Sequence, residues 1–82
     1  MAKPCEAMPL DELRAEWEAG AERHVDFKQN DGMFWSLVDF RHRLMVIRYL
    51  KVENGWCAFP DIYVGYDIWR CLNYIADAIN AS

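Results

Sequence analysis

A short turn in the second half of the chain, ENG at 53–55, restricts what its flanks can form. The run before it, RLMVIRYLKV, and the run after it, WCAF, are rich in residues that favour strands. Glycine at the end of such a turn supplies the left-handed conformation that a three-residue hairpin loop needs. We therefore predict that one strand ends near Val52 and that the next begins at Trp56.

The stretch before this hairpin fits two interpretations. From Met33 to Ile47 apolar residues recur at helical spacing, whereas the many aromatic and β-branched residues of the same stretch favour strands. Because a strand must lead into the hairpin, we favour strands and keep a helix over 33–50 as the alternative. Pro60 should end the last strand, since proline cannot donate a hydrogen bond to a ladder. The predicted strands are 24–28, 33–39, 43–52 and 56–59.

Two amphipathic segments flank these strands. In PLDELRAEWEAG, at 9–20, Pro9 suits the first helical turn and Gly20 suits the residue after the end. The apolar residues between them fall on one helical stripe. After the strands, Asp67 is a good N-cap for a second helix, whose apolar stripe runs from Ile68 to about position 80.

Together these elements predict an α+β fold in the order α-β-β-β(β)-α. An antiparallel meander sheet would be packed by the two helices, because each helix has an apolar stripe to bury. A chain of 82 residues is long enough for one domain only. We therefore take 1–82 as a single small domain, with 1–8 as a flexible N-terminal segment.

The cysteine and hydropathy patterns bear on the compartment. Cys5, Cys57 and Cys71 are odd in number and form no C-x-x-C pair, which predicts buried reduced thiols and no zinc or redox site. No apolar run is long enough to span a bilayer, and the N-terminus lacks the apolar stretch of a secretory signal. These patterns predict a cytoplasmic protein that does not bind a membrane.

The net charge of −4 is unevenly distributed. Acids dominate residues 1–23, whereas residues 40–52 carry four Lys or Arg residues and no acid. An acidic chain disfavours binding to a phosphate backbone and favours docking on a basic protein surface. The acidic side of the first predicted helix is either a solvated surface or a docking face. The candidate docking residues are Asp11, Glu12, Glu16, Glu18 and Glu22.

No catalytic, metal-binding or phosphate-binding motif stands out. His24 and His42 lie in different predicted elements, and neither forms a recognisable nucleophile signature with a cysteine. No single carboxylate is distinguished for acid-base chemistry, and the sequence has no glycine-rich phosphate loop. The sequence therefore predicts a non-enzymatic protein without a cofactor or a metal site.

The basic stretch supports a second hypothesis, a small nucleic-acid-binding module. In a strand, Arg43, Tyr49 and Lys51 would share an outer face, where charge and ring stacking can hold single-stranded nucleic acid. The same pattern is also typical of a solvated face that forms ion pairs with an acidic helix. The candidate nucleic-acid-binding residues are Arg41, Arg43, Arg48, Tyr49 and Lys51.

In size, acidity, aromatic content and lack of catalytic motifs, the chain resembles small acidic proteins of phages and other mobile elements, anti-CRISPR inhibitors among them. Many proteins of this class bind and block a host protein. The resemblance implies a protein-binding inhibitor or adaptor that occupies a basic surface of a host complex, including a surface that normally holds nucleic acid. A few aromatic anchors would supply affinity, and the candidates are Tyr63, Tyr66 and Trp69. A self-associating structural domain is the further alternative, and the sequence leaves open whether the chain is a monomer or a homodimer.

Overall fold

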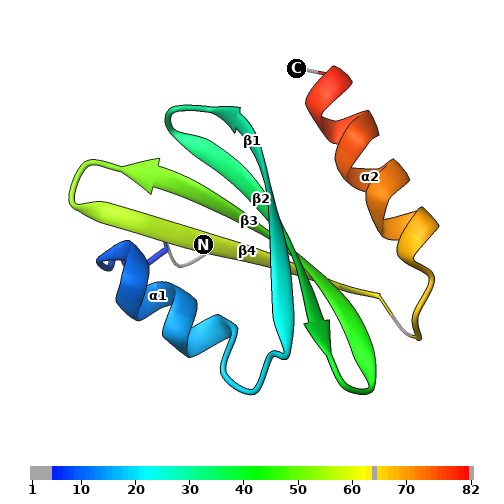
Figure 1. Ribbon diagram of the computed structural model, residues 1–82. Coiled ribbons are helices and arrows are strands. Elements are labelled where there is room, and N and C mark those ends of the chain that lie inside the picture. Colours follow the sequence, from blue (N-terminus) through cyan, green and yellow to red (C-terminus); the bar gives the residue numbers. More distant parts are fainter. Residues whose placement is uncertain (1–4, 64, 82) are drawn as a thin grey trace.

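Four strands pair in the middle of the chain, between a helix near each end. The computed structural model describes residues 5–63 and 65–81. The elements are α1 (Leu10–Trp17), β1 (Arg23–Asn30), β2 (Met33–Phe40), β3 (Arg43–Val52), β4 (Gly55–Tyr63) and α2 (Ile68–Asn80). Neighbouring strands are antiparallel and lie in the order β1-β2-β3-β4 (Figure 1). The predicted α+β domain with a meander sheet and two helices is confirmed.

The stretch that fitted both a helix and strands forms β2 and β3, so the helical alternative is wrong. Phe40 pairs with Arg43 across a two-residue turn. β3 is buried continuously from Leu44 to Ile47, because the two helices cover both faces of the sheet. Strands buried on both faces lose the alternation of apolar and polar residues. For this reason the stretch imitates a helical stripe.

The sheet has two apolar faces, and each is covered by one helix (Figure 1). On the face under α2, called the α2 face here, two buried helix residues pack on four buried strand residues: Cys71 and Ile75 on Trp35, Leu37, Leu44 and Val46. On the opposite α1 face, one buried helix residue packs on four strand residues: Leu13 on Val38, Met45, Ile47 and Tyr49. β2 and β3 contribute to both clusters and form the centre of the domain.

β4 continues through Pro60 to Tyr63, which corrects the prediction that Pro60 ends the strand. Met8 and Trp56 exchange two backbone hydrogen bonds, of 3.1 and 2.8 Å, so the backbone polar groups of Trp56 face away from β3. Alternation along the strand places those of Pro60 on the same outer side. A proline at this position removes no hydrogen bond to β3, so the edge strand tolerates it.

The hairpin between β3 and β4 is one residue tighter than predicted. Gly55 pairs with Val52 as the first residue of β4, and only Glu53 and Asn54 form the turn. Gly55 has a φ of +142°, and a Cβ built on it would lie 2.6 Å from the carbonyl oxygen of Met8. Glycine is therefore needed here both for its backbone conformation and for the close approach of the N-terminal segment.

Cys5 and Cys57 form a disulfide, which corrects the prediction of three buried reduced thiols. Cys71 alone is a free, buried thiol. Residues 5–8, called the N-terminal segment here, are fastened to β4 by this disulfide and by the bridge between Met8 and Trp56. The rest of the predicted flexible segment, residues 1–4, lies outside the described residues. Cys5 and Cys57 are 52 residues apart in sequence, so spacing gave no sign of their pairing.

α2 begins where the sequence predicts. The side chain of Asp67 accepts a hydrogen bond from the backbone N–H of Arg70 (3.0 Å), which is the expected N-cap interaction. α1 is shorter than its predicted segment and ends at Trp17. Within residues 5–63 and 65–81, no helix has the length and apolar character needed to cross a membrane.

Candidate functional site

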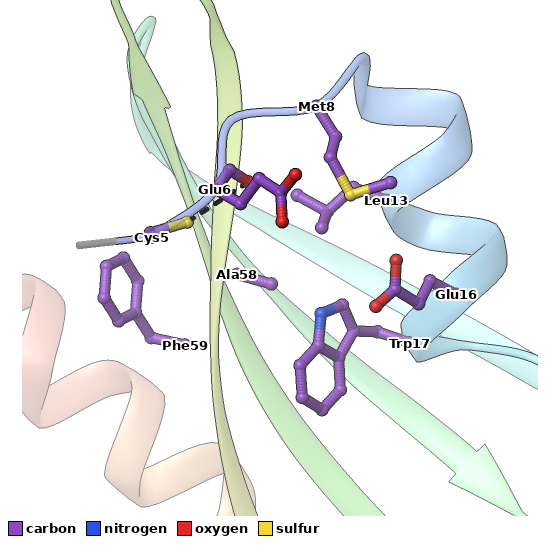
Figure 2. Close-up of a pocket in the computed structure, with 8 residues that line it drawn as sticks. All are labelled: Cys5, Glu6, Met8, Leu13, Glu16, Trp17, Ala58 and Phe59. Carbon is purple, nitrogen blue, oxygen red and sulfur yellow. Dashed lines mark hydrogen bonds between the residues drawn. The ribbon is translucent and has the colours of Figure 1, made fainter. Parts of the chain in front are cut away.

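A pocket of about 370 Å³ opens where the N-terminal segment, α1 and β4 meet (Figure 2). It exists because the disulfide and the bridge between Met8 and Trp56 hold the N-terminal segment beside α1. Each of the three elements contributes to its wall. The lining residues are Cys5, Glu6, Met8, Leu13, Glu16, Trp17, Ala58 and Phe59.

Two carboxylates and an apolar wall set the character of this pocket. Figure 2 shows the side chains of Glu6 and Glu16 reaching into the same space from different sides, with the indole of Trp17 next to Glu16. Both glutamates are exposed, and neither carboxylate forms an ion pair with another described residue. A hollow that is apolar inside and negative at its rim suits a long cationic side chain. The stem of such a side chain packs on apolar groups while its charged head meets the carboxylates.

One short contact in the pocket is not a hydrogen bond. The dashed line in Figure 2 joins Sγ of Cys5 to the backbone carbonyl oxygen of Glu6 at 3.7 Å. Because Sγ of Cys5 is bonded to Cys57, it carries no proton to donate. We treat this approach as a packing contact that follows from the disulfide.

The structure retains most of the predicted acidic face. Asp11, Glu12 and Glu16 are exposed on α1, and Glu22 is exposed beyond the helix, just before β1. Glu18 does not belong to this face, because its side chain is only 9% exposed. Its inclusion among the surface residues is corrected accordingly.

Glu18 instead anchors α1 to the sheet. Its carboxylate accepts hydrogen bonds from the guanidinium of Arg14 (2.9 Å) and from the hydroxyl of Tyr49 (2.5 Å). Arg14 also donates to Asp26 (2.8 Å) and lies over the rings of Phe34 and Tyr49. The acid that looked free in the sequence is therefore part of a polar network between α1 and three strands.

This network shifts the pKa values of its members. Burial and the hydrogen bond to Glu18 raise the pKa of Tyr49, so its hydroxyl stays protonated at ordinary pH. Burial alone would raise the pKa of Asp26, but the hydrogen bond and charge of Arg14 outweigh it and hold that pKa below its usual value. His24 lies 3.4 Å from Glu18 at the edge of the network. The packing of α1 accounts for all of these groups, and we assign them no catalytic role.

The predicted basic surface is not assembled. Tyr49 is fully buried on the α1 face, which corrects the prediction that its ring lies on an outer face. Arg48 lies on the α2 face, where it stacks over two aromatic rings. Arg41 lies in the turn before β3, Arg43 at the start of β3 and Lys51 near its end. The five residues therefore offer no continuous surface on which a nucleic-acid strand could stack.

The three aromatic candidates differ in exposure. Tyr63 packs on the α2 face, with its ring 5.5 Å from that of Tyr74. Tyr66 is half exposed, and its hydroxyl donates to the backbone carbonyl of Phe40. Trp69 is 72% exposed on α2. Because α1 and α2 cover opposite faces of the sheet (Figure 1), these rings and the acidic pocket do not form one surface.

In the part of the chain that the structure describes, no side chains are arranged to bind a metal ion or to support thiol chemistry. Within residues 5–63 and 65–81, no group of three His, Cys, Asp or Glu side chains could hold a metal ion. The thiol of Cys71 is buried, and burial raises its pKa. A thiol in such a place stays protonated and unreactive.

Two residues of the pocket were not predicted from the sequence as site residues. Trp17 lies on the apolar stripe of the first helix, so it was interpreted as core alone, and Glu6 lies in the segment predicted to be flexible. The signal that could have found them was Cys5, whose pairing with Cys57 brings Glu6 to α1. Spacing alone does not reveal such a pairing.

A scan against protein-family models, a search of curated proteins and a search of solved structures each gave no match. Function is therefore argued from the geometry and charge of the described residues.

Proposed function

We propose that this chain is a non-enzymatic protein-binding domain that takes a basic segment of another protein at the acidic pocket. The observation that carries the proposal is the pair of carboxylates, Glu6 and Glu16, at the rim of an apolar pocket beside Trp17. The side chain bound there would be an arginine or a lysine. Its cationic head would meet the two carboxylates, and the indole of Trp17 would add a cation–π contact.

The charge around the pocket would assist the encounter. Asp11 and Glu12 are exposed on the same helix as Glu16, and none of the three forms an ion pair with a described residue. Clustered charge of one sign raises the rate at which an oppositely charged partner arrives. The apolar wall of the pocket would then contribute most of the affinity, because it is desolvated when the partner binds.

A domain of this kind would act as an inhibitor or an adaptor. Small acidic phage proteins, including anti-CRISPR inhibitors, are the class that the chain resembles, and occupation of a basic host surface would be its mode of action. A basic surface that normally holds nucleic acid is a suitable target, since it presents the arginine and lysine side chains that the pocket accepts.

The pocket depends on a disulfide, and this bears on where the protein acts. Disulfides persist in oxidising compartments and are rare in a reducing cytosol. In a reducing compartment the N-terminal segment would lose the bond between Cys5 and Cys57 and keep its backbone bridge from Met8 to Trp56. We propose that the pocket is complete only where this bond is formed.

Charge reversal at the rim tests the proposal. The double variant Glu6→Lys, Glu16→Lys should bind a labelled arginine-rich peptide at least about tenfold more weakly than the wild type, because its rim repels the peptide. Fluorescence anisotropy measures the affinity, and circular dichroism checks that the variant is folded.

The matched control reverses two exposed acids that do not line the pocket. Glu53→Lys with Asp77→Lys produces the same change in net charge, on the turn after β3 and on α2. This control should bind the peptide nearly as well as the wild type. Equal losses in both double variants would show that net charge alone attracts the peptide and would refute the pocket.

A further inference from the structure

β1 forms one edge of the sheet, and the pairing of the other strands shows which of its residues face outward. The backbone N–H of Lys51 donates to the carbonyl of Gly32 (2.8 Å), so the backbone N–H and C=O groups of Lys51 point towards β2. The direction of the backbone hydrogen-bonding groups alternates from residue to residue along antiparallel strands. Those of Phe34 in β2 therefore point towards β3, and those of Trp35 point towards β1. The backbone groups of Phe27, the partner of Trp35, therefore point towards β2.

Three alternate residues of β1 therefore direct backbone N–H and C=O groups away from the sheet: His24, Asp26 and Lys28. No described segment pairs with this side of β1, and the strand contains no proline. Charged side chains usually discourage pairing at such an edge. Here, however, the charges of Asp26 and Lys28 differ in sign, so the edge does not carry charge of one sign alone. In an antiparallel arrangement β1 can therefore complement a second copy of itself.

An apolar patch adjoins this edge on the α2 face. Val25 is 55% exposed and Ile68 is 47% exposed. Both border a hollow of about 370 Å³ that Leu37 and Leu44 also line. Because Val25 lies in the middle of the open strand, anything that pairs with the strand also covers the patch. A contiguous apolar patch beside unpaired backbone groups is typical of an interaction surface.

We propose that the β1 edge and this patch form a homodimer interface, in which two copies of β1 pair antiparallel about a two-fold axis at Val25. His24 of one copy exchanges backbone hydrogen bonds with Asp26 of the second copy. Val25 contacts its own counterpart, and the two Ile68 side chains flank that contact. The two sheets then form one continuous sheet, and both acidic pockets remain free.

Charge and burial select this register among those that a two-fold axis allows. An axis at Asp26 would place two carboxylates opposite each other. An axis at Phe27 would place Asp26 opposite Lys28, but Val25 would then face the polar side chain of Gln29. The axis at Val25 places no like charges opposite each other and covers the exposed apolar patch, as a self-complementary interface requires.

Size-exclusion chromatography with light scattering, over a series of concentrations, tests the interface. The wild type should have the mass of two chains when concentrated and of one chain when dilute. Val25→Lys should raise the dissociation constant at least about tenfold, because it places two ammonium groups at the axis. Ile62→Lys is the matched control: Ile62 is similarly exposed (57%) on β4, the other edge strand, so this variant should dimerise as the wild type does.

Two outcomes would overturn the interface. One is a wild-type chain that is monomeric at every concentration. The other is dimerisation that Ile62→Lys abolishes and Val25→Lys does not. Because β1 lies at the opposite edge of the sheet from the acidic pocket, peptide binding by the pocket is a separate readout.

Cysteine cross-linking tests the register. Directly opposed residues without mutual hydrogen bonds have Cα atoms about 4.5 Å apart, which is within reach of a disulfide. Val25→Cys should therefore give a covalent dimer on a non-reducing gel, whereas Phe27→Cys, opposite Arg23 in this register, should not. A cross-link at position 27 without one at position 25 would refute the axis at Val25.

Discussion

The two edges of the sheet are protected in different ways. Beside β4, Met8 occupies part of the edge, a disulfide fixes the segment that carries it, and Pro60 removes one outward donor. β1 has none of these features and carries only polar or charged side chains at the outward positions of its open backbone. Unpaired edges are where other chains add strands. In our proposals, the closed edge supplies a pocket for a side chain of another protein, and the open edge pairs with a second copy.

Among the changes considered, removal of the disulfide beside β4 should reduce stability the most. Cys5→Ser with Cys57→Ser should lower the free energy of unfolding by about 4 kcal/mol, the chain-entropy estimate for a closed loop of this length. Urea denaturation measures it. A reductant should destabilise the wild type by a similar amount and leave the double variant unchanged. A wild type that is insensitive to reductant would show that the bond does not stabilise the closed edge.

Gly55→Ala should open the closed edge by a different route. The added Cβ would lie 2.6 Å from the carbonyl oxygen of Met8, in a backbone conformation that alanine rarely adopts. We expect a loss of about 2 kcal/mol and faster amide exchange at Met8 and Trp56. Gly20→Ala is the control, since Gly20 also has a positive φ (+83°) but nothing within 4 Å of its added Cβ. Equal losses in both variants would mean that backbone strain, and not the N-terminal segment, explains the effect.

Acid should act on the open edge through Asp26. Its pKa is lower in the folded state than in the unfolded state because of Arg14, so the unfolded state takes up its proton first as the pH falls. The stability that Asp26 contributes is therefore present above its unfolded pKa and is lost as the pH falls from about 5 towards 2. The contribution should be below about 1 kcal/mol, because the side chain is partly exposed.

The variant Asp26→Asn measures this contribution. It should flatten the dependence of unfolding free energy on pH in that range, in a Val25→Lys background that removes self-association. Asn73→Ala, at an exposed uncharged side chain of α2, is the control and should leave the slope nearly unchanged, because it changes no titratable group. An unaltered slope in Asp26→Asn would contradict the role given to the pairing of Arg14 with Asp26.

Pro60→Ala should have the smallest effect. Because the backbone of Pro60 faces away from β3, alanine gains no ladder bond and adds flexibility to the unfolded chain. The free energy of unfolding should fall by less than about 1 kcal/mol, while the restored outward N–H should increase aggregation on prolonged incubation. Stabilisation by alanine would instead mean that position 60 faces β3.

The sequence predicted the order of the elements and most of their bounds. Asp67 as an N-cap and the turn at Glu53 and Asn54 act over a few residues, so local chemistry was sufficient to locate α2 and the last hairpin. The interval 33–50 remained ambiguous, because a strand buried on both faces has no alternating pattern. The length of β4 was misjudged because the side to which Pro60 faces depends on pairing, and pairing is not visible in one strand.

The candidate site was predicted only in part. Glu16 was expected to be an exposed acid and is one, whereas Glu18 has the same residue type two positions away and is buried against Tyr49. Helical spacing does not distinguish a carboxylate that meets solvent from one that meets a buried hydroxyl on a distant strand. Glu6 joins the site because a disulfide spans 52 residues.

By itself, the sequence determined an acidic α+β domain with two amphipathic helices and a meander sheet, because propensity, turn residues and caps act over short distances. The tertiary structure alone decided that the helices cover opposite faces, that Cys5 meets Cys57, and that one edge is closed and the other open. Those outcomes depend on contacts between residues far apart in the chain. Such contacts form only when burial of the apolar stripes brings the elements together.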